Sequence, residues 1–241
     1  MEEKELKTST GQRVAISIIA FVMLGSIIAS YAAIIIGNSS KSDSSESKLS
    51  DERMAYYQNN YEEKLGAFKE VSKNDFTAFS PYMSEVKAYN EKTANESGIQ
   101  IRDLLAGTGR ALGEKDGDYL AYYVGWCADE TIFDSSLDNK TSPTSFSKAL
   151  DVSVGMIEGW YQGAQGMKLG GVREITIPGE LAYGDKTEIC GGYNKPLKFL
   201  IMPVAAEDPL KTASKELDTA YMALQYANYG MDYEKEVVSN N

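Results

Sequence analysis

The chain of 241 residues contains no histidine and only two cysteines, Cys127 and Cys190. Without histidine there is no Ser/His/Asp triad, no Cys/His pair and no histidine general base. Two cysteines far apart in the sequence also cannot supply the ligands of a zinc ribbon. These absences remove several common catalytic and metal-binding arrangements together.

Positive charge is also scarce, because 24 Lys and Arg residues stand against 35 Asp and Glu residues, for a formal net charge of −11. The acidic residues are spread along the chain rather than gathered in one tail. Nucleic-acid binding depends on Lys and Arg that neutralise phosphates, so we expect no nucleic-acid partner. With 43% hydrophobic residues, the chain can bury the core of one moderate domain plus attachments.

Residues 14–36, VAISIIAFVMLGSIIASYAAIII, contain no charged side chain. This run is long enough to cross a bilayer as a tilted helix and favours a membrane anchor. A cleaved signal peptide is the alternative, because Ser30 and Ala32 give a small-x-small pattern. The flanking basic residues give a weak positive-inside bias, with three before the run and two after it: Lys4, Lys7 and Arg13, then Lys41 and Lys48. We expect residues 1–13 in the cytoplasm, a single pass, and the rest of the chain outside.

The residues after this run change from a linker to a helical pattern. Residues 37–50 are polar and Ser-rich, which predicts a flexible tether whose ends lie about 20 Å apart. Residues 51–98 have apolar and aromatic side chains at helical spacing, with a second helix expected from Ser80 and Pro81. The aromatic stripe in residues 51–98 is compatible with a homodimer interface, but so short a segment favours packing of these side chains against the next domain or on each other.

From residue 99 the pattern changes to short strands. Runs such as DYLAYYVGWC at 118–127 and LKFLIMPV at 197–204 are rich in β-branched and aromatic residues and are separated by turn residues. One short helix, around Trp160, interrupts them. The pattern predicts an α+β domain in which an antiparallel sheet wraps around this helix. Residues 205–241 return to helical spacing, which predicts a terminal helix docked on the domain.

Several motifs of this region occur together, in one order. They are GDYLAYYVGWCADETIFDSS at 117–136, SFSKALDVSVGMIEGWYQGAQGMKLGGVREITIPGELAYG at 145–184, and KPLKFLIMPV at 195–204. Through them, residues 99–204 resemble the FKBP-type peptidyl-prolyl cis/trans isomerases. The resemblance implies a half-wrapped antiparallel sheet around one short helix, here with an N-terminal transmembrane helix and flanking helices. It also implies an apolar pocket for a proline ring, with no cofactor and no metal.

The resemblance assigns the site residues position by position. Trp160 corresponds to the floor of the pocket, and Asp134 and Tyr183 to polar positions at its rim, so these three are the expected catalytic residues. The backbone N–H of Ile157 corresponds to the donor that holds a substrate carbonyl. The expected walls are Tyr123, Phe133, Phe146, Met156, Ile157 and Phe199. An aromatic cluster in a small sheet domain is by itself more often core, and only the order of the motifs favours a site.

The chemistry of such a site is conformational. Rotation about an X-Pro bond meets a barrier of roughly 18–20 kcal/mol that comes from amide resonance. A dry aromatic cleft that binds the twisted amide better than the planar one lowers this barrier without proton transfer. We therefore expect a peptidyl-prolyl isomerase that acts on proline-containing polypeptides, in particular exported proteins, at the outer side of the membrane.

The loop at 184–196 lacks the apolar and Pro-rich residues that often close the pocket in the family. It favours the alternative function, a non-catalytic proline-peptide binding or chaperone module anchored to the membrane. Cys190 lies in this loop, and Cys127 lies at the end of an expected inner strand. Outside the membrane a disulfide between them is chemically permitted, and we expect one. The alternative is a buried thiol at Cys127 and an exposed thiol at Cys190.

Overall fold

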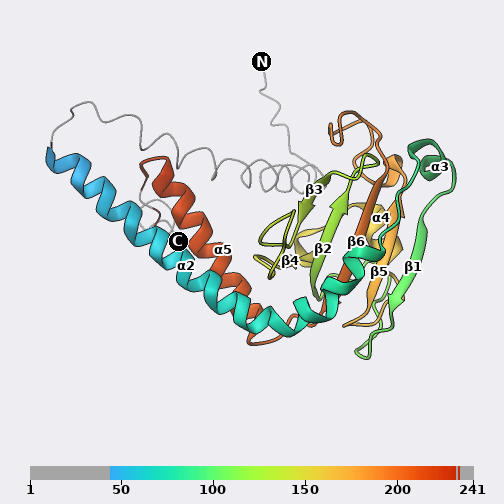
Figure 1. Ribbon diagram of the computed structural model, residues 1–241, viewed down its shortest axis with the longest axis horizontal. Helices are drawn as coiled ribbons and strands as arrows, with labels where there is room; N and C mark the ends of the chain where they lie inside the picture. Colours follow the sequence, from blue (N-terminus) through green and yellow to red (C-terminus); the bar gives the residue numbers. More distant parts are fainter. Residues whose placement is uncertain (1–43, 232, 234–241) are drawn as a thin grey trace, which may run out of the picture.

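The structure, a computed structural model, describes residues 44–231 and 233. These residues form a domain built on one sheet and a pair of long helices that extends from it (Figure 1). The expected segment 1–13, the expected span 14–36 and the first residues of the expected linker lie outside the described residues. Among residues 44–231 and 233, no helix is both long and apolar enough to cross a membrane.

One antiparallel sheet forms the centre of the domain, as the alternation of short strands predicts. Its order is β1-β5-β6-β2-β3, and β4 pairs with β2 beside this path. The strands are β1 (Gln100–Leu105), β2 (Leu120–Trp126), β3 (Ile132–Ser135), β4 (Leu150–Asp151), β5 (Val172–Ile177) and β6 (Leu197–Val204). Every residue of β5 and β6 is buried. These strands therefore have protein on both faces of the sheet.

The short helix α4 (Glu158–Ala164) covers one face of the sheet. Gly159 and Gly163 lie four residues apart and so share one side of this helix. A Cβ atom on Gly159 would lie 2.2 Å from Ile177, and one on Gly163 would lie 2.5 Å from Ile175. The two glycines therefore allow the backbone of α4 to approach β5 closely, and this approach fixes the height of Trp160 above the sheet.

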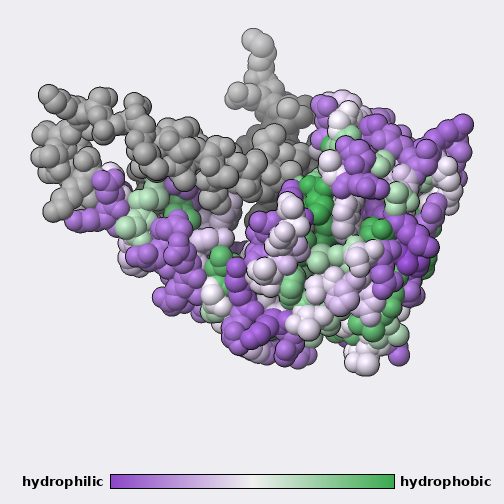
Figure 2. Space-filling model, viewed as in Figure 1, coloured by the Kyte–Doolittle hydropathy of each residue, from purple (hydrophilic) through white to green (hydrophobic). Residues whose placement is uncertain are grey.

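The helix α2 (Ser44–Phe79) packs its C-terminal half on the opposite face. Phe68 and Phe79 are fully buried there against Leu120, Tyr122 and other residues of the sheet. Hydrophilic residues cover most of the outer side of α2 in the view of Figure 2. The sheet thus separates two cores, one under α4 and one under α2.

The helix α2 begins at Ser44, so residues 44–50 of the expected flexible tether are helical. This stretch contains Glu and Lys, which are good helix formers, and the helix continues without a break into residues 51–79. Ser80 does not begin a separate α-helix, because Ser80–Glu85 forms a 3-10 turn, η1, directly after α2, with Pro81 at its start. A six-residue helix, α3 (Glu91–Glu96), follows, and the Asn90 side chain caps it.

The terminal helix α5 (Leu210–Asn228) lies beside α2 (Figure 1). Its first half contributes Ala213 and Leu217 to the core under α2, whereas Leu224 in its second half packs with Tyr57 of α2. Lys64 and Glu216 form an ion pair of 3.1 Å between the two helices. The tail therefore docks on the domain together with α2, as one helix pair.

Candidate active site

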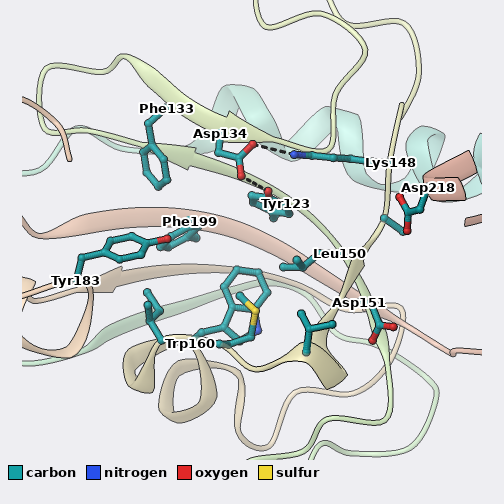
Figure 3. A pocket seen from close by; sticks show the side chains of 14 residues that line it. Tyr123, Phe133, Asp134, Lys148, Leu150, Asp151, Trp160, Tyr183, Phe199 and Asp218 are labelled. Carbon is teal, nitrogen blue, oxygen red and sulfur yellow. Dashed lines mark hydrogen bonds and ion pairs between the residues drawn. The ribbon is translucent and has the colours of Figure 1, made fainter. Parts of the chain in front are cut away.

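A cavity of about 200 Å³ opens between α4 and the sheet. Figure 3 shows its side chains, which come from β2, β3, β4, β6, α4, α5 and the connecting loops. The cavity is lined by Tyr123, Phe133, Asp134, Lys148, Ala149, Leu150, Asp151, Val154, Met156, Ile157, Trp160, Tyr183, Phe199 and Asp218. Eight of the nine expected site residues are thus brought together in one place.

Trp160 is fully buried and forms the base of the cavity. Its indole Nε1 donates a hydrogen bond of 3.0 Å to the hydroxyl of Tyr119, which fixes the plane of the ring. Tyr123 and Phe199 meet the indole edge to face, with ring centroids 5.9 Å and 5.5 Å away. Edge-to-face packing of this kind holds aromatic walls rigidly around a floor.

Phe133 extends the aromatic wall, with its centroid 5.5 Å from that of Phe199. Gly125 of β2 pairs with Phe199 on one side and with Asp134 on the other. A Cβ atom at Gly125 would lie 2.6 Å from Phe133 and 3.0 Å from Phe199. Gly125 therefore provides the space in which the two rings meet, a role that the sequence analysis did not recognise.

Asp134 lies at the rim within a small polar network (Figure 3). It accepts hydrogen bonds from the Tyr123 hydroxyl and from Lys148, whose Nζ lies 2.9 Å away. The Lys148 ammonium is also 5.7 Å from the centre of the Tyr123 ring. Burial first, and the charge of Asp134 second, raise the pKa values of Tyr123 and Tyr183. Both hydroxyls are therefore neutral around pH 7 and act only as hydrogen-bonding groups.

Ile157 precedes α4 as its N-cap residue. The neighbouring N–H of Met156 donates to the Tyr161 hydroxyl at 3.1 Å, whereas the N–H of Ile157 has no acceptor among the described residues. Because Ile157 lines the cavity, its N–H is available to a ligand carbonyl, as the resemblance implies.

Phe146 is not part of the cavity, so its expected place in the wall was wrong. Its ring stacks on Tyr122 with centroids 3.9 Å apart, and Phe76 and Phe79 meet it edge to face. Tyr122 and Tyr123 are neighbours on β2 and point to opposite faces of the sheet. Phe146 joins the Tyr122 face, which is the core under α2.

Six lining residues were missed: Lys148, Ala149, Leu150, Asp151, Val154 and Asp218. The first five follow Phe146 in one stretch, and their position directly before the motif around Trp160 could have indicated them. Asp218 belongs to α5, and no local pattern connects that helix with the pocket. Burial of its carboxyl group first, and the charge of Asp151 second, raise the pKa of Asp218 to about 6, whereas Lys148 lowers it.

Cys127 and Cys190 form a disulfide in the structure. The bridge joins the end of β2 to the loop at 184–196, and neither cysteine lines the cavity. The loop turns tightly at this point, because Ile189 and Gly192 form an isolated β-bridge and Gly191 has a φ angle of 76°. The disulfide therefore anchors the loop that follows Tyr183 to the strand pair that carries Phe133 and Asp134.

An antiparallel sheet that wraps a short helix, with a tryptophan-floored aromatic cavity between them, defines an FKBP-like domain. Residues 114–202 match the sequence pattern of the family described as FKBP-type peptidyl-prolyl cis-trans isomerase. The FK506-binding protein of Neisseria meningitidis serogroup B is 39% identical over 108 residues, which are 44% of this chain and 92% of that protein.

Two further proteins are similar to about half of the chain. The FKBP-type 22 kDa peptidyl-prolyl cis-trans isomerase of Escherichia coli is 33% identical over 123 residues, 51% of this chain and 55% of that protein. The crystal structure of a peptidyl-prolyl cis-trans isomerase from Pseudomonas syringae pv. tomato has 28% identity and a TM-score of 0.36, and covers 56% of this chain and 94% of that one. On the sequence matches, the chain belongs to the FKBP-type peptidyl-prolyl cis/trans isomerase family.

Proposed function

We propose that the chain is a membrane-anchored isomerase that turns X-Pro bonds of exported polypeptides at the outer side of the membrane. The proposed turnover is supported by the aromatic cavity around Trp160, in a chain that belongs to an isomerase family. The anchor is supported by the uncharged run at 14–36. The outer location is supported by the Cys127–Cys190 disulfide, since such bonds persist in oxidising compartments.

In the proposed mechanism the proline ring rests on Trp160, between Tyr123 and Phe199. A planar amide carries more charge on its carbonyl oxygen than a twisted one, because twisting ends the conjugation with nitrogen. An apolar cavity therefore favours the twisted amide over the planar amide. The N–H of Ile157 holds a carbonyl of the bound chain, so that rotation takes place on one side of the bond only.

Asp134 acts in this mechanism through Tyr123. The carboxylate holds the tyrosine hydroxyl at the rim, and Lys148 balances its charge. In this orientation the Tyr123 ring turns its face toward the proline ring. The orientation agrees with the edge-to-face contact between Tyr123 and Trp160. We assign Asp134 as a positioning residue and Trp160 as the residue that contacts the substrate.

The location is tested with intact spheroplasts that express the full chain. Added protease should remove the isomerase domain without permeabilisation, and the uncleaved chain should remain in the membrane fraction after a salt wash. A domain that is protected until the membrane is opened would contradict the outer location. A chain that appears in the soluble fraction would contradict the anchor.

The homodimer through residues 51–98 stays a prediction. Within this segment, Tyr57, Phe68 and Phe79 are buried against the chain itself, which supports the alternative of packing within one molecule. Tyr56 remains 60% exposed on α2. A dimer would therefore have to use the outer side of α2 rather than the buried aromatic residues.

A further inference from the structure

The two ends of the cavity differ in chemistry. At one end the aromatic residues Phe133 and Tyr183 close it, whereas the other end continues past Trp160 to Leu150, Asp151 and Asp218 (Figure 3). The aspartates come from different elements, since Asp151 ends β4 and Asp218 lies on α5. The cavity that we assign to proline is therefore continuous with an acidic end.

The charges at this end are not balanced. The cavity is lined by three carboxylates and one ammonium, a net charge of −2 when all are ionised: Asp134, Asp151, Asp218 and Lys148. The ammonium of Lys148 lies 2.9 Å from Asp134, and its charge also lowers the pKa of Asp218, so one ammonium faces more than one carboxylate. Asp151 accepts an N–H from Ser153 at 2.9 Å. Within residues 44–231 and 233, neither Asp151 nor Asp218 forms an ion pair.

Asp151 and Asp218 are both exposed residues, and although neighbouring atoms partly desolvate the Asp218 carboxyl group and raise its pKa to about 6, it is mostly ionised at pH 7 and a cation can reach both side chains. Between them and the aromatic floor lies apolar surface from Leu150 and from Val154, which is 59% exposed. Lys and Arg side chains suit such a path, because their methylene groups pack on apolar surface while the charged end stays in water. An acidic side chain would be repelled by the two aspartates, and a purely apolar side chain would match only the apolar surface.

We propose that this end of the cavity is a subsite for a basic side chain of the bound polypeptide, with Asp151 and Asp218 as its specificity residues. The inference rests on the proposed function, in which the proline ring occupies the Trp160 end. An extended chain advances about 3.3–3.6 Å per residue, so the side chains one or two positions from the proline are the ones to test for binding at this end. Asp218 lies outside the family match at 114–202, so this preference is a property of this chain's own C-terminal helix.

The test compares isomerisation of matched peptides by the full-length chain in a mild non-ionic detergent. The peptides share one X-Pro core and carry Lys, Leu or Glu at one of the two positions on either side of it. At low salt we expect the Lys peptide to exceed the Glu peptide in kcat/KM by about tenfold at the favoured position, with Leu between them. At 0.5 M salt, screening should reduce the ratio to about twofold.

The variants Asp218→Asn and Asp151→Asn should each reduce the Lys-to-Glu ratio by about threefold, and this ratio is compared within each variant so that a loss of kcat/KM common to all peptides cancels. Glu114→Gln is the matched control, because it removes one negative charge from a part of the domain that does not line this cavity. The control should keep the wild-type ratio. Circular dichroism of each variant checks that α5 remains folded.

The results separate the two proposals. Turnover of all peptides with a Lys-to-Glu ratio near one, or a ratio unchanged in both aspartate variants, overturns the basic subsite and leaves the isomerase intact. An equal loss of ratio in Glu114→Gln also overturns it, because the effect would then come from overall charge. No turnover of any peptide by the folded chain contradicts the proposed function itself.

Discussion

Two adjacent tyrosines on β2 serve different parts of the molecule. Tyr123 faces the cavity together with Trp160. Tyr122 faces the core under α2, where the Phe146 ring stacks on it with ring centroids 3.9 Å apart. Phe199, on the cavity side of β6, meets Trp160 edge to face, with ring centroids 5.5 Å apart. Residue types alone do not distinguish these rings, and only the face of the sheet decides which of them contacts the substrate.

We therefore expect Phe146→Leu and Phe199→Leu to lower stability alike but to differ in their effect on kcat/KM. Each should lower the free energy of unfolding by about 1–2 kcal/mol, because each removes part of a packed ring. Phe199→Leu should reduce kcat/KM for an X-Pro peptide by about tenfold, whereas Phe146→Leu should leave it within about twofold of wild type. Urea unfolding and a peptide assay measure the two quantities. Equal losses of kcat/KM in both variants would show that the two rings are wrongly assigned.

Asp134 and Tyr123 form a hydrogen-bonded pair at the rim of the cavity. Asp134→Asn removes the charge that balances Lys148, and Tyr123→Phe removes the hydroxyl that Asp134 accepts. Each single variant should lose about fivefold in kcat/KM, or about 1 kcal/mol, roughly the net value of one ordinary hydrogen bond. If Asp134 acts through Tyr123, the double variant should lose little more than either single variant. Losses that multiply in the double variant would contradict the positioning role.

Among the elements, the segment between α2 and β1 is held to the sheet by buried charge. Glu174 of β5 accepts hydrogen bonds from Lys198 at 2.7 Å and from Arg102 at 2.6 Å. Lys198 also donates to the carbonyl oxygen of Lys87 at 2.6 Å, and Arg102 donates to that of Glu85 at 2.6 Å. The network therefore connects three strands with the chain that runs from η1 toward α3.

We expect Glu174→Gln to lower the free energy of unfolding by about 3 kcal/mol at pH 7, because it leaves Lys198 buried without its counter-charge. Burial alone raises the pKa of Glu174, but the hydrogen bonds from Lys198 and Arg102 outweigh it and lower the pKa overall. The charge of Glu174 therefore stabilises the wild type fully above a pH of about 4.5, the pKa in the unfolded chain. This stabilisation is lost as the pH falls further and passes the lower pKa of the folded state. Glu63→Gln on the surface of α2 is the control.

Urea unfolding of the three proteins between pH 3 and pH 7 measures this difference. The gap between wild type and Glu174→Gln should close toward pH 3, while kcat/KM per folded molecule at pH 7 stays unchanged. A gap that stays constant with pH would contradict the role of the carboxylate charge.

The Cys127–Cys190 disulfide joins the end of β2 to the loop at 184–196. It closes a stretch with a sequence separation of 63 residues, for which chain entropy in the unfolded state predicts about 4 kcal/mol of stabilisation. Reduction, or the double variant Cys127→Ser/Cys190→Ser, should therefore lower Tm by about 10 °C. Because neither cysteine lines the cavity, activity well below Tm should change by less than about threefold. An unchanged Tm after verified reduction would contradict this.

Local sequence patterns predicted the fold class of the domain better than they predicted the contacts between distant parts of the chain. The strands of the sheet and the helix around Trp160 follow from short-range periodicity and from motifs that occur in order. Asp218 could not be predicted as a pocket residue, because α5 reaches the pocket through its packing with α2. The start of α2 was misjudged for a related reason, since serine content suggested a linker where the helix continues.

Phe146 shows the same limit within the domain itself. Phe146 lies close in sequence to residues that line the pocket. Which face of the sheet its ring joins depends on the path by which residues 136–147 return to β2. Hydrogen bonds from Ser136 to Tyr123 and from Ser147 to Ser136 set that return. Such a path is a property of the folded chain, and a one-residue change in it moves a side chain to the opposite face.

The two tryptophans of the chain allow a matched test of whether the cavity around Trp160 turns X-Pro bonds. Trp160 forms the floor of the cavity, whereas Trp126 lies at the end of β2 and packs with the core under α2. The measurement is kcat/KM for cis-to-trans isomerisation of an X-Pro peptide by wild type, Trp160→Leu and Trp126→Leu, each shown to be folded by circular dichroism. We predict catalysis by the wild type, a loss of at least about tenfold in Trp160→Leu, and a change within about twofold in Trp126→Leu. Wild-type turnover in a folded Trp160→Leu protein, or a wild type that does not exceed the uncatalysed rate, would contradict the account.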